Sequence, residues 1–156
     1  MLSRTIISSL VCLWLSQHAY AATGSIMFNG TVGATCALNI TSPTGVLVPS
    51  GTLQSLSSRL SGGAAGVVTV TTTGGVTLSL EPTPSAVTVP AGDTTSTVWT
   101  PSYSVTGAQT IANTTTATPL TAAGTNVVNV DLTGTKTGSN TFVSGAYSAT
   151  VTVKCE

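Results

Sequence analysis

The segment from residue 26 to residue 40 alternates strictly between two kinds of residue. Its even positions are apolar or small: Ile26, Phe28, Gly30, Val32, Ala34, Cys36, Leu38 and Ile40. Its odd positions are mostly polar or small: Met27, Asn29, Thr31, Gly33, Thr35, Ala37 and Asn39. A period of two excludes a helix and predicts one long β-strand with one apolar face. Such a strand must find an edge to pair with, in its own domain or in another molecule.

The residues before this strand have the pattern of a secretion signal. Arg4 supplies a positive charge, Ile6–Leu15 a short apolar run, and Ala19-Tyr20-Ala21 a cleavage site. We expect residues 1–21 to be cleaved and the mature chain to reach a bacterial periplasm or cell surface. The alternative is an uncleaved membrane anchor, which needs about 20 apolar residues. Polar residues interrupt the run at 16–18, so we expect no transmembrane segment in the mature chain.

Two cysteines, Cys36 and Cys155, remain once the signal is removed. Cys36 lies on the apolar side of the first strand. Cys155 ends a second alternating run that starts at Tyr147. In an oxidising compartment the sequence predicts one disulfide between them, with two free thiols as the alternative.

Charged residues make up only 5% of the chain, against about 25% in ordinary soluble domains. The few cations are scattered, which excludes a phosphate-binding surface and hence a nucleic-acid partner. The single histidine, His18, lies in the predicted signal, so we predict no catalytic residues, no metal site and no cofactor. We interpret the carboxylates of Glu81, Asp93 and Asp131 as solvated surface charges.

Further short strands follow the first one, and no window of 11 or more residues has helical periodicity. The strands are expected at 66–72, 76–80, 87–89, 96–106, 125–134 and 145–155. The pair Gly74-Gly75 is typical of a hairpin turn between the first two of these. About seven short strands separated by turns predict an all-β antiparallel sandwich. Trp99 and Tyr103 share one side of their strand and are expected in its core.

The two ends of the chain resemble subunits of chaperone-usher pili, including the archaic branch related to spore coat protein U. The amino-terminal part is Ile26-Met-Phe28-Asn-Gly30-Thr-Val32, followed by Cys36-Ala-Leu38. It is similar to the donor-strand region of such pilins and to the cysteine of their first strand. The carboxy-terminal part, Gly145-Ala-Tyr147-Ser-Ala149-Thr-Val151-Thr-Val153, is similar to their final strand.

The resemblance implies an immunoglobulin-like sandwich that lacks one strand. In that family the amino-terminal extension of the next subunit fills the resulting groove. The implied donor side chains are Ile26, Phe28, Gly30 and Val32. The implied acceptor strand carries Tyr147, Ala149, Val151 and Val153. The implied partners are like subunits, a periplasmic chaperone and an outer-membrane usher.

Two functions therefore compete for this chain. The first is a secreted structural subunit of a surface pilus, with a donor segment at 22–34 and a β-sandwich at 35–156. The alternative is a monomeric periplasmic or surface binding module, adhesin-like, that uses loop side chains such as Trp99 and Tyr103. They differ in whether residues 22–33 bind another molecule or belong to their own folded domain.

Overall fold

The computed structural model of the protein describes residues 23–156. The chain divides into two units, one ending at Thr31 and one comprising Val32–Glu156. Residues 23–31 form no strand or helix, and the second unit is built from twelve β-strands without a helix. The expected all-β antiparallel sandwich is confirmed, although many strands are shorter and more numerous than predicted. The predicted signal at 1–21 lies outside the described residues.

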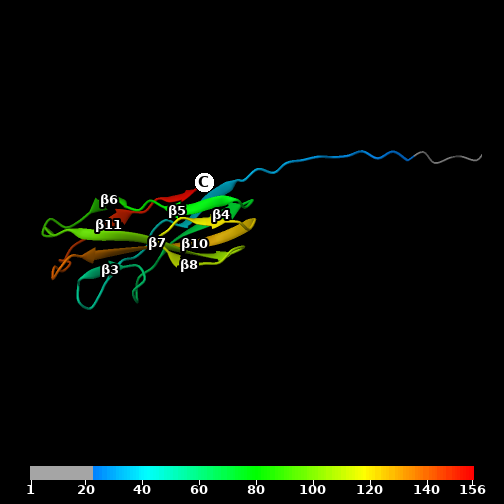
Figure 1. Ribbon diagram of the computed structural model, residues 1–156. Coiled ribbons are helices and arrows are strands. Elements are labelled where there is room, and N and C mark those ends of the chain that lie inside the picture. The colour runs from blue at the N-terminus through cyan, green and yellow to red at the C-terminus, as the bar shows by residue number, and fades with distance from the viewer. Residues whose placement is uncertain (1–22) are drawn as a thin grey trace, which may run out of the picture. The chain divides into compact units, whose positions relative to one another are not determined.

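Seven strands form the larger sheet, in which the long strand β10 is central (Figure 1). One edge of β10 pairs first with β4 and then with β3, and its other edge pairs with β7 from Asn126 to Lys136. The order along the first edge is β1-β4-β10-β3-β2, and β8 pairs with β7. The bounds are β1 Cys36–Ser42, β2 Val48–Pro49, β3 Ser55–Ser57, β4 Gly66–Thr72, β7 Thr97–Gly107, β8 Ile111–Thr114 and β10 Gly124–Lys136.

A second layer covers the larger sheet. It contains the three-stranded order β12-β5-β9 and the pair β11-β6. Its strands are β5 Val76–Leu80, β6 Ser85–Thr88, β9 Thr118–Leu120, β11 Ser148–Thr150 and β12 Val153–Cys155. All pairings in both layers are antiparallel.

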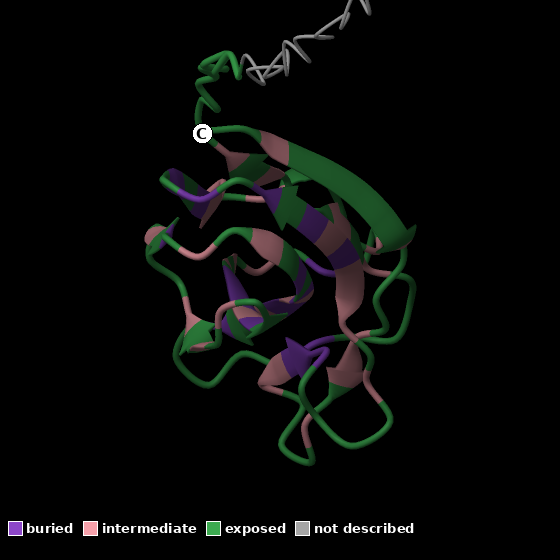
Figure 2. Ribbon diagram, turned by 90° about the vertical axis from the view of Figure 1, so that its right-hand side faces the viewer, coloured by how far each residue is buried: buried purple, intermediate pink, exposed green. Residues whose placement is uncertain are grey.

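The core lies between these two layers, and Figure 2 shows buried residues alternating with more exposed ones along several strands. One wall comes from the larger sheet, where Tyr103 is fully buried and donates its hydroxyl to the carbonyls of Leu78 and Thr116. The cluster consists of Val68, Val70, Val76, Leu78, Tyr103, Val105, Leu120 and Val128. Tyr103 is thus the only large aromatic in the cluster, and branched aliphatic side chains fill the rest.

The predicted single strand from residue 26 to residue 40 is wrong in its first part. Only Cys36–Ser42 forms a strand, β1, and its apolar side is not dry: the exposed fractions are 43% for Leu38 and 64% for Ile40. A strand needs a neighbour for its backbone groups. β1 has β4 on one edge, whereas residues 23–31 have no strand partner.

The predicted hairpin at Gly74-Gly75 is also wrong. Both glycines have positive φ, 85° and 74°, as the sequence indicates. The strands on either side do not pair with each other, because β4 belongs to the larger sheet and β5 to the second layer. The turn therefore carries the chain from one layer to the other.

Replacing Leu78 by alanine tests where the core lies. Leu78 is fully buried between the layers, so L78A is expected to lower the free energy of unfolding by about 2–5 kcal/mol. Urea denaturation followed by fluorescence measures this change. The matched control is V127A, an exposed position on β10, which is expected to stay within about 0.5 kcal/mol of the parent protein. Equal effects of the two variants would contradict this assignment of the core.

Candidate functional site

The candidate site is an apolar groove between two strands that each have a free edge. Among the described residues, β1 pairs only with β4, and β12 pairs only with β5. The remaining edge of each carries backbone N–H and C=O groups with no strand beside them. Open edges of this kind can accept a further strand.

The groove between these edges has a volume of about 740 Å³, within the range of sites that take a ligand. Leu38 and Ile40 of β1 form one wall. The other wall comes from the carboxy-terminal strand, where the side chains at Tyr147, Ala149, Val151 and Val153 are half-buried and the residues between them are exposed. This alternation confirms the predicted sidedness of the strand, although residues 151–152 interrupt it between β11 and β12.

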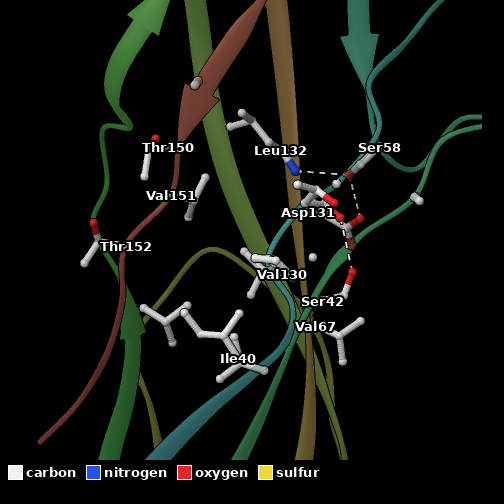
Figure 3. A pocket seen from close by; sticks show the side chains of 18 of the residues that line it. Ile40, Ser42, Ser58, Val67, Val130, Asp131, Leu132, Thr150, Val151 and Thr152 are labelled. Carbon is white, nitrogen blue, oxygen red and sulfur yellow. Dashed lines mark hydrogen bonds between the residues drawn. The ribbon is translucent and has the colours of Figure 1, made fainter.

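The floor of the groove is mostly aliphatic and comes from β4 and β10. Val68, Val130 and Leu132 contribute to it, and Figure 3 shows Val130 lying between Ile40 of one wall and Val151 of the other. These residues could contact apolar side chains of a strand laid along the groove. An apolar lining gains free energy when it is covered, at about 25 cal/mol per Å² of apolar surface.

Beyond one end of the groove, a disulfide joins Cys36 at the start of β1 to Cys155 at the end of β12. The predicted pairing of these cysteines is confirmed. Their Cα atoms are 6.2 Å apart and their sequence separation is 119 residues. The bond joins the two edge strands, one from each layer, and so fixes the distance between the groove walls at this end.

Ser58 hydrogen-bonds to β10 at the point where the edge of β10 changes its partner from β4 to β3. The Ser58 N–H donates to the Leu132 carbonyl (3.1 Å), and the Leu132 N–H donates to the Ser58 hydroxyl (3.1 Å). The same hydroxyl donates to Oδ1 of Asp131 (2.7 Å; Figure 3). Asp131 is therefore buried at the groove instead of solvated, which corrects the interpretation of this carboxylate as a surface charge.

A buried ion pair lies near the other end of the groove. Nζ of Lys136, the last residue of β10, is 2.6 Å from both carboxylate oxygens of Asp93 and donates to the Thr95 carbonyl. The Tyr147 hydroxyl donates to Oδ2 of Asp93 (2.7 Å). The Phe142 ring covers Nζ of Lys136 at 4.9 Å from its centroid. Asp93 is thus a second predicted surface charge that the structure buries.

This cluster sets the ionisation of its members. The Lys136 ammonium, and after it the Tyr147 hydroxyl, hold the pKa of Asp93 well below its usual range. Burial, and then the hydrogen bond to Asp93, raise the pKa of Tyr147. Tyr147 marks the start of the predicted acceptor strand, so the cluster positions the wall of the groove opposite β1.

The predicted donor residues are exposed. The exposed fractions of Ile26, Phe28 and Val32 are 80%, 89% and 81%. A Cβ built at Gly30 has no atom within 4 Å. The described structure thus leaves three large apolar side chains without a covering surface.

Neither of the two aromatic residues of the alternative, a binding module, lines the groove. Tyr103 is fully buried, as expected. Trp99 is half-buried and packs over Gly134, where a Cβ would come within 2.6 Å of its ring. Its ring centroid lies 6.4 Å from that of Phe142.

Within residues 23–156 no group of three or more His, Cys, Asp or Glu side chains is arranged to hold a metal ion. The same residues include no helix long and apolar enough to cross a membrane. Sequence reasoning missed the Asp93–Lys136 pair. The only signal was that a chain with so few charges keeps a lysine on the inward side of a strand.

Comparison with known protein families, curated proteins and solved structures gives no match for this chain. The groove is therefore interpreted from its own geometry and chemistry.

Removing the disulfide is expected to weaken the fold strongly. A loop of this length contributes up to about 4–5 kcal/mol in the chain-entropy model. The double variant Cys36→Ser/Cys155→Ser should lose stability on that scale, and the parent protein in reductant should lose a similar amount. Urea denaturation measures both. A double variant as stable as the oxidised parent would contradict the role of this bond.

The Asp93 cluster predicts a specific pH dependence. Because the folded state lowers the pKa of Asp93, its contribution to stability is present above the unfolded value of 3.8 and is lost as the pH falls below it. In D93N the melting temperature should be lower at neutral pH, and its decline between about pH 5 and pH 2 should be shallower. The control is E81Q, which changes an exposed ion pair with Lys154 and should retain the parent slope. A parent-like slope in D93N would contradict this assignment.

Proposed function

We propose that this chain is a secreted structural subunit of a surface filament, and that it polymerises by donor-strand exchange. Residues 26–32 of one copy occupy the groove between β1 and the carboxy-terminal strand of another. The observation that carries the proposal is the open apolar groove between two free strand edges in a chain that also has an uncovered segment of alternating apolar residues.

The dimensions of the segment and the groove agree. Residues 26–32 are as many as the residues of β1, Cys36–Ser42. As an extended strand their side chains at 26, 28 and 32 would point to one side and cover the aliphatic floor and the exposed Leu38 and Ile40. Gly30 would leave room where two backbones approach closely.

The contact would be heterologous, because the donor segment and the groove are different surfaces of the same chain. Repeated head-to-tail contacts of this kind form an open filament unless their rotation closes a ring. The neutral, threonine-rich surface fits such an assembly, since like charges on neighbouring subunits would not repel. By the resemblance to pilus subunits, a periplasmic chaperone and an outer-membrane usher would be the assembly partners.

A peptide-binding experiment tests the proposal. A protein that begins at Gly33 should remain monomeric and should bind a peptide copying residues 22–34. With free peptide at about 100 times its dissociation constant, the gain is about 2.7 kcal/mol, or roughly 10 °C in melting temperature. The matched control is the same peptide with Phe28→Asp, which should give no shift. The chain from residue 22 onward should form filaments visible by electron microscopy.

A truncated protein that ignores both peptides would contradict the proposal. The groove would then not accept this segment. A monomeric full-length chain that binds a carbohydrate would favour the binding module instead.

A further inference from the structure

The chain just before β1 is held by three hydrogen bonds between its backbone and threonine side chains and by one backbone hydrogen bond. The Thr73 hydroxyl donates to the Gly33 carbonyl (2.9 Å) and accepts from the Thr35 N–H (2.8 Å). The Thr73 N–H donates to the Thr35 carbonyl (3.2 Å), which also accepts from the Thr72 hydroxyl (2.9 Å). We call Thr72 and Thr73, with these bonds to Gly33–Thr35, the threonine clamp.

We propose that the threonine clamp prevents the donor segment from folding back into the groove of its own chain, so that the segment is presented to a second copy. This inference rests on the proposed function. It concerns the choice between a closed monomer and a polymer, which the groove alone does not determine, because the same apolar lining would accept residues 26–32 from either source.

The register of a hairpin shows why the clamp lies at the decisive place. To fold back, residues 26–32 would run antiparallel to β1, where cross-strand neighbours point to the same side. A three-residue loop formed by Gly33–Thr35 would bring the apolar positions opposite one another: Val32 with Cys36, Gly30 with Leu38, Phe28 with Ile40 and Ile26 with Ser42. A loop shorter or longer by one residue would turn the apolar side chains to the opposite face.

The residues that must form this loop are those that the clamp holds. Both carbonyls and the N–H that it binds belong to Gly33 and Thr35. The adjoining Cys36 is tied to Cys155, so β1 cannot shift to relieve the loop. A hairpin would therefore break the clamp while the disulfide stays in place.

A turn earlier in the chain does not offer an equivalent route. The dipeptide Asn29-Gly30 is a good hairpin turn in sequence. A turn there would place Phe28 opposite Thr31 and Ile26 opposite Gly33. These residues precede β1, so the apolar side chains would not reach Leu38 and Ile40.

The substitution Thr73→Val tests the proposal on the mature chain from residue 22 onward. It keeps the shape of the side chain and removes the hydroxyl that makes two of the clamp bonds. Thr71→Val is the matched control. It is the same change two residues earlier, on β4, and the Thr71 hydroxyl hydrogen-bonds with Thr125 and not with residues 33–35.

Hydrogen exchange at the amides of residues 26–32 distinguishes a closed monomer from a polymer. It is measured over a dilution series, and light scattering follows polymer formation in the same samples. In the parent protein and in T71V, protection should appear only as the concentration rises and polymers form. In T73V the fraction of monomer whose amides are protected at every concentration should rise about tenfold. Losing two hydrogen bonds of the open monomer shifts its equilibrium with the closed, folded-back monomer by roughly this factor.

Two results would overturn the inference. One is concentration-independent protection in the parent monomer, which would mean that the segment folds back despite the clamp. The other is identical behaviour of T73V and T71V with polymers still forming, which would leave the proposed function intact and remove the role of Thr73. Absence of protection at every concentration, together with no effect of the 22–34 peptide, would instead reject the proposed function and this inference with it.

Discussion

Two strand edges without partners, held a fixed distance apart, dominate this molecule. β1 belongs to one layer and β12 to the other, and each has only one paired edge among the described residues. In an ordinary sandwich further strands would cover the residues between such edges. Here Leu38 and Ile40 are exposed, because among the described residues no strand lies beside the free edge of β1. The Cys36–Cys155 bond keeps the two layers joined at one end.

The other end of the groove is positioned by charge. Lys136, Asp93 and Tyr147 come from β10, a loop and the start of the carboxy-terminal strand, and their polar atoms satisfy one another away from solvent. A buried ion pair contributes little net stability compared with apolar packing. It does fix geometry, because each partner is costly to leave unpaired. The groove is thus held by a disulfide at one end and by an ion pair at the other.

The sequence predicted the features that depend on local alternation. Periodicity predicted the strand at 66–72 and the sidedness of the carboxy-terminal strand. Periodicity and the predicted oxidising compartment together indicated the pairing of Cys36 with Cys155. Features that depend on pairing between distant parts of the chain could not be predicted from the sequence. Gly74-Gly75 has the chemistry of a hairpin, yet it joins two layers, because the neighbours of β4 and β5 lie far away in the sequence.

In the candidate site too, local features could be predicted from the sequence and long-range contacts could not. The apolar positions of both walls could be read from the alternation. The burial of Asp93 and Asp131 could not, since it depends on Lys136 and Ser58, which lie 43 and 73 residues away from them. Likewise the first part of the strand expected at 26–40 has the right pattern, but residues 26–32 have no strand partner in the described structure.

The place where Cys36 lies also determines how the domain would bear force. In a filament of the proposed kind, tension would enter each subunit through the segment before β1. At Cys36 that load would pass directly through the disulfide to β12, and so to both layers at once. β1 could not be peeled from β4 one hydrogen bond at a time, because its pulled end is covalently anchored. Under load such a domain would therefore not begin to unfold by the loss of β1 alone.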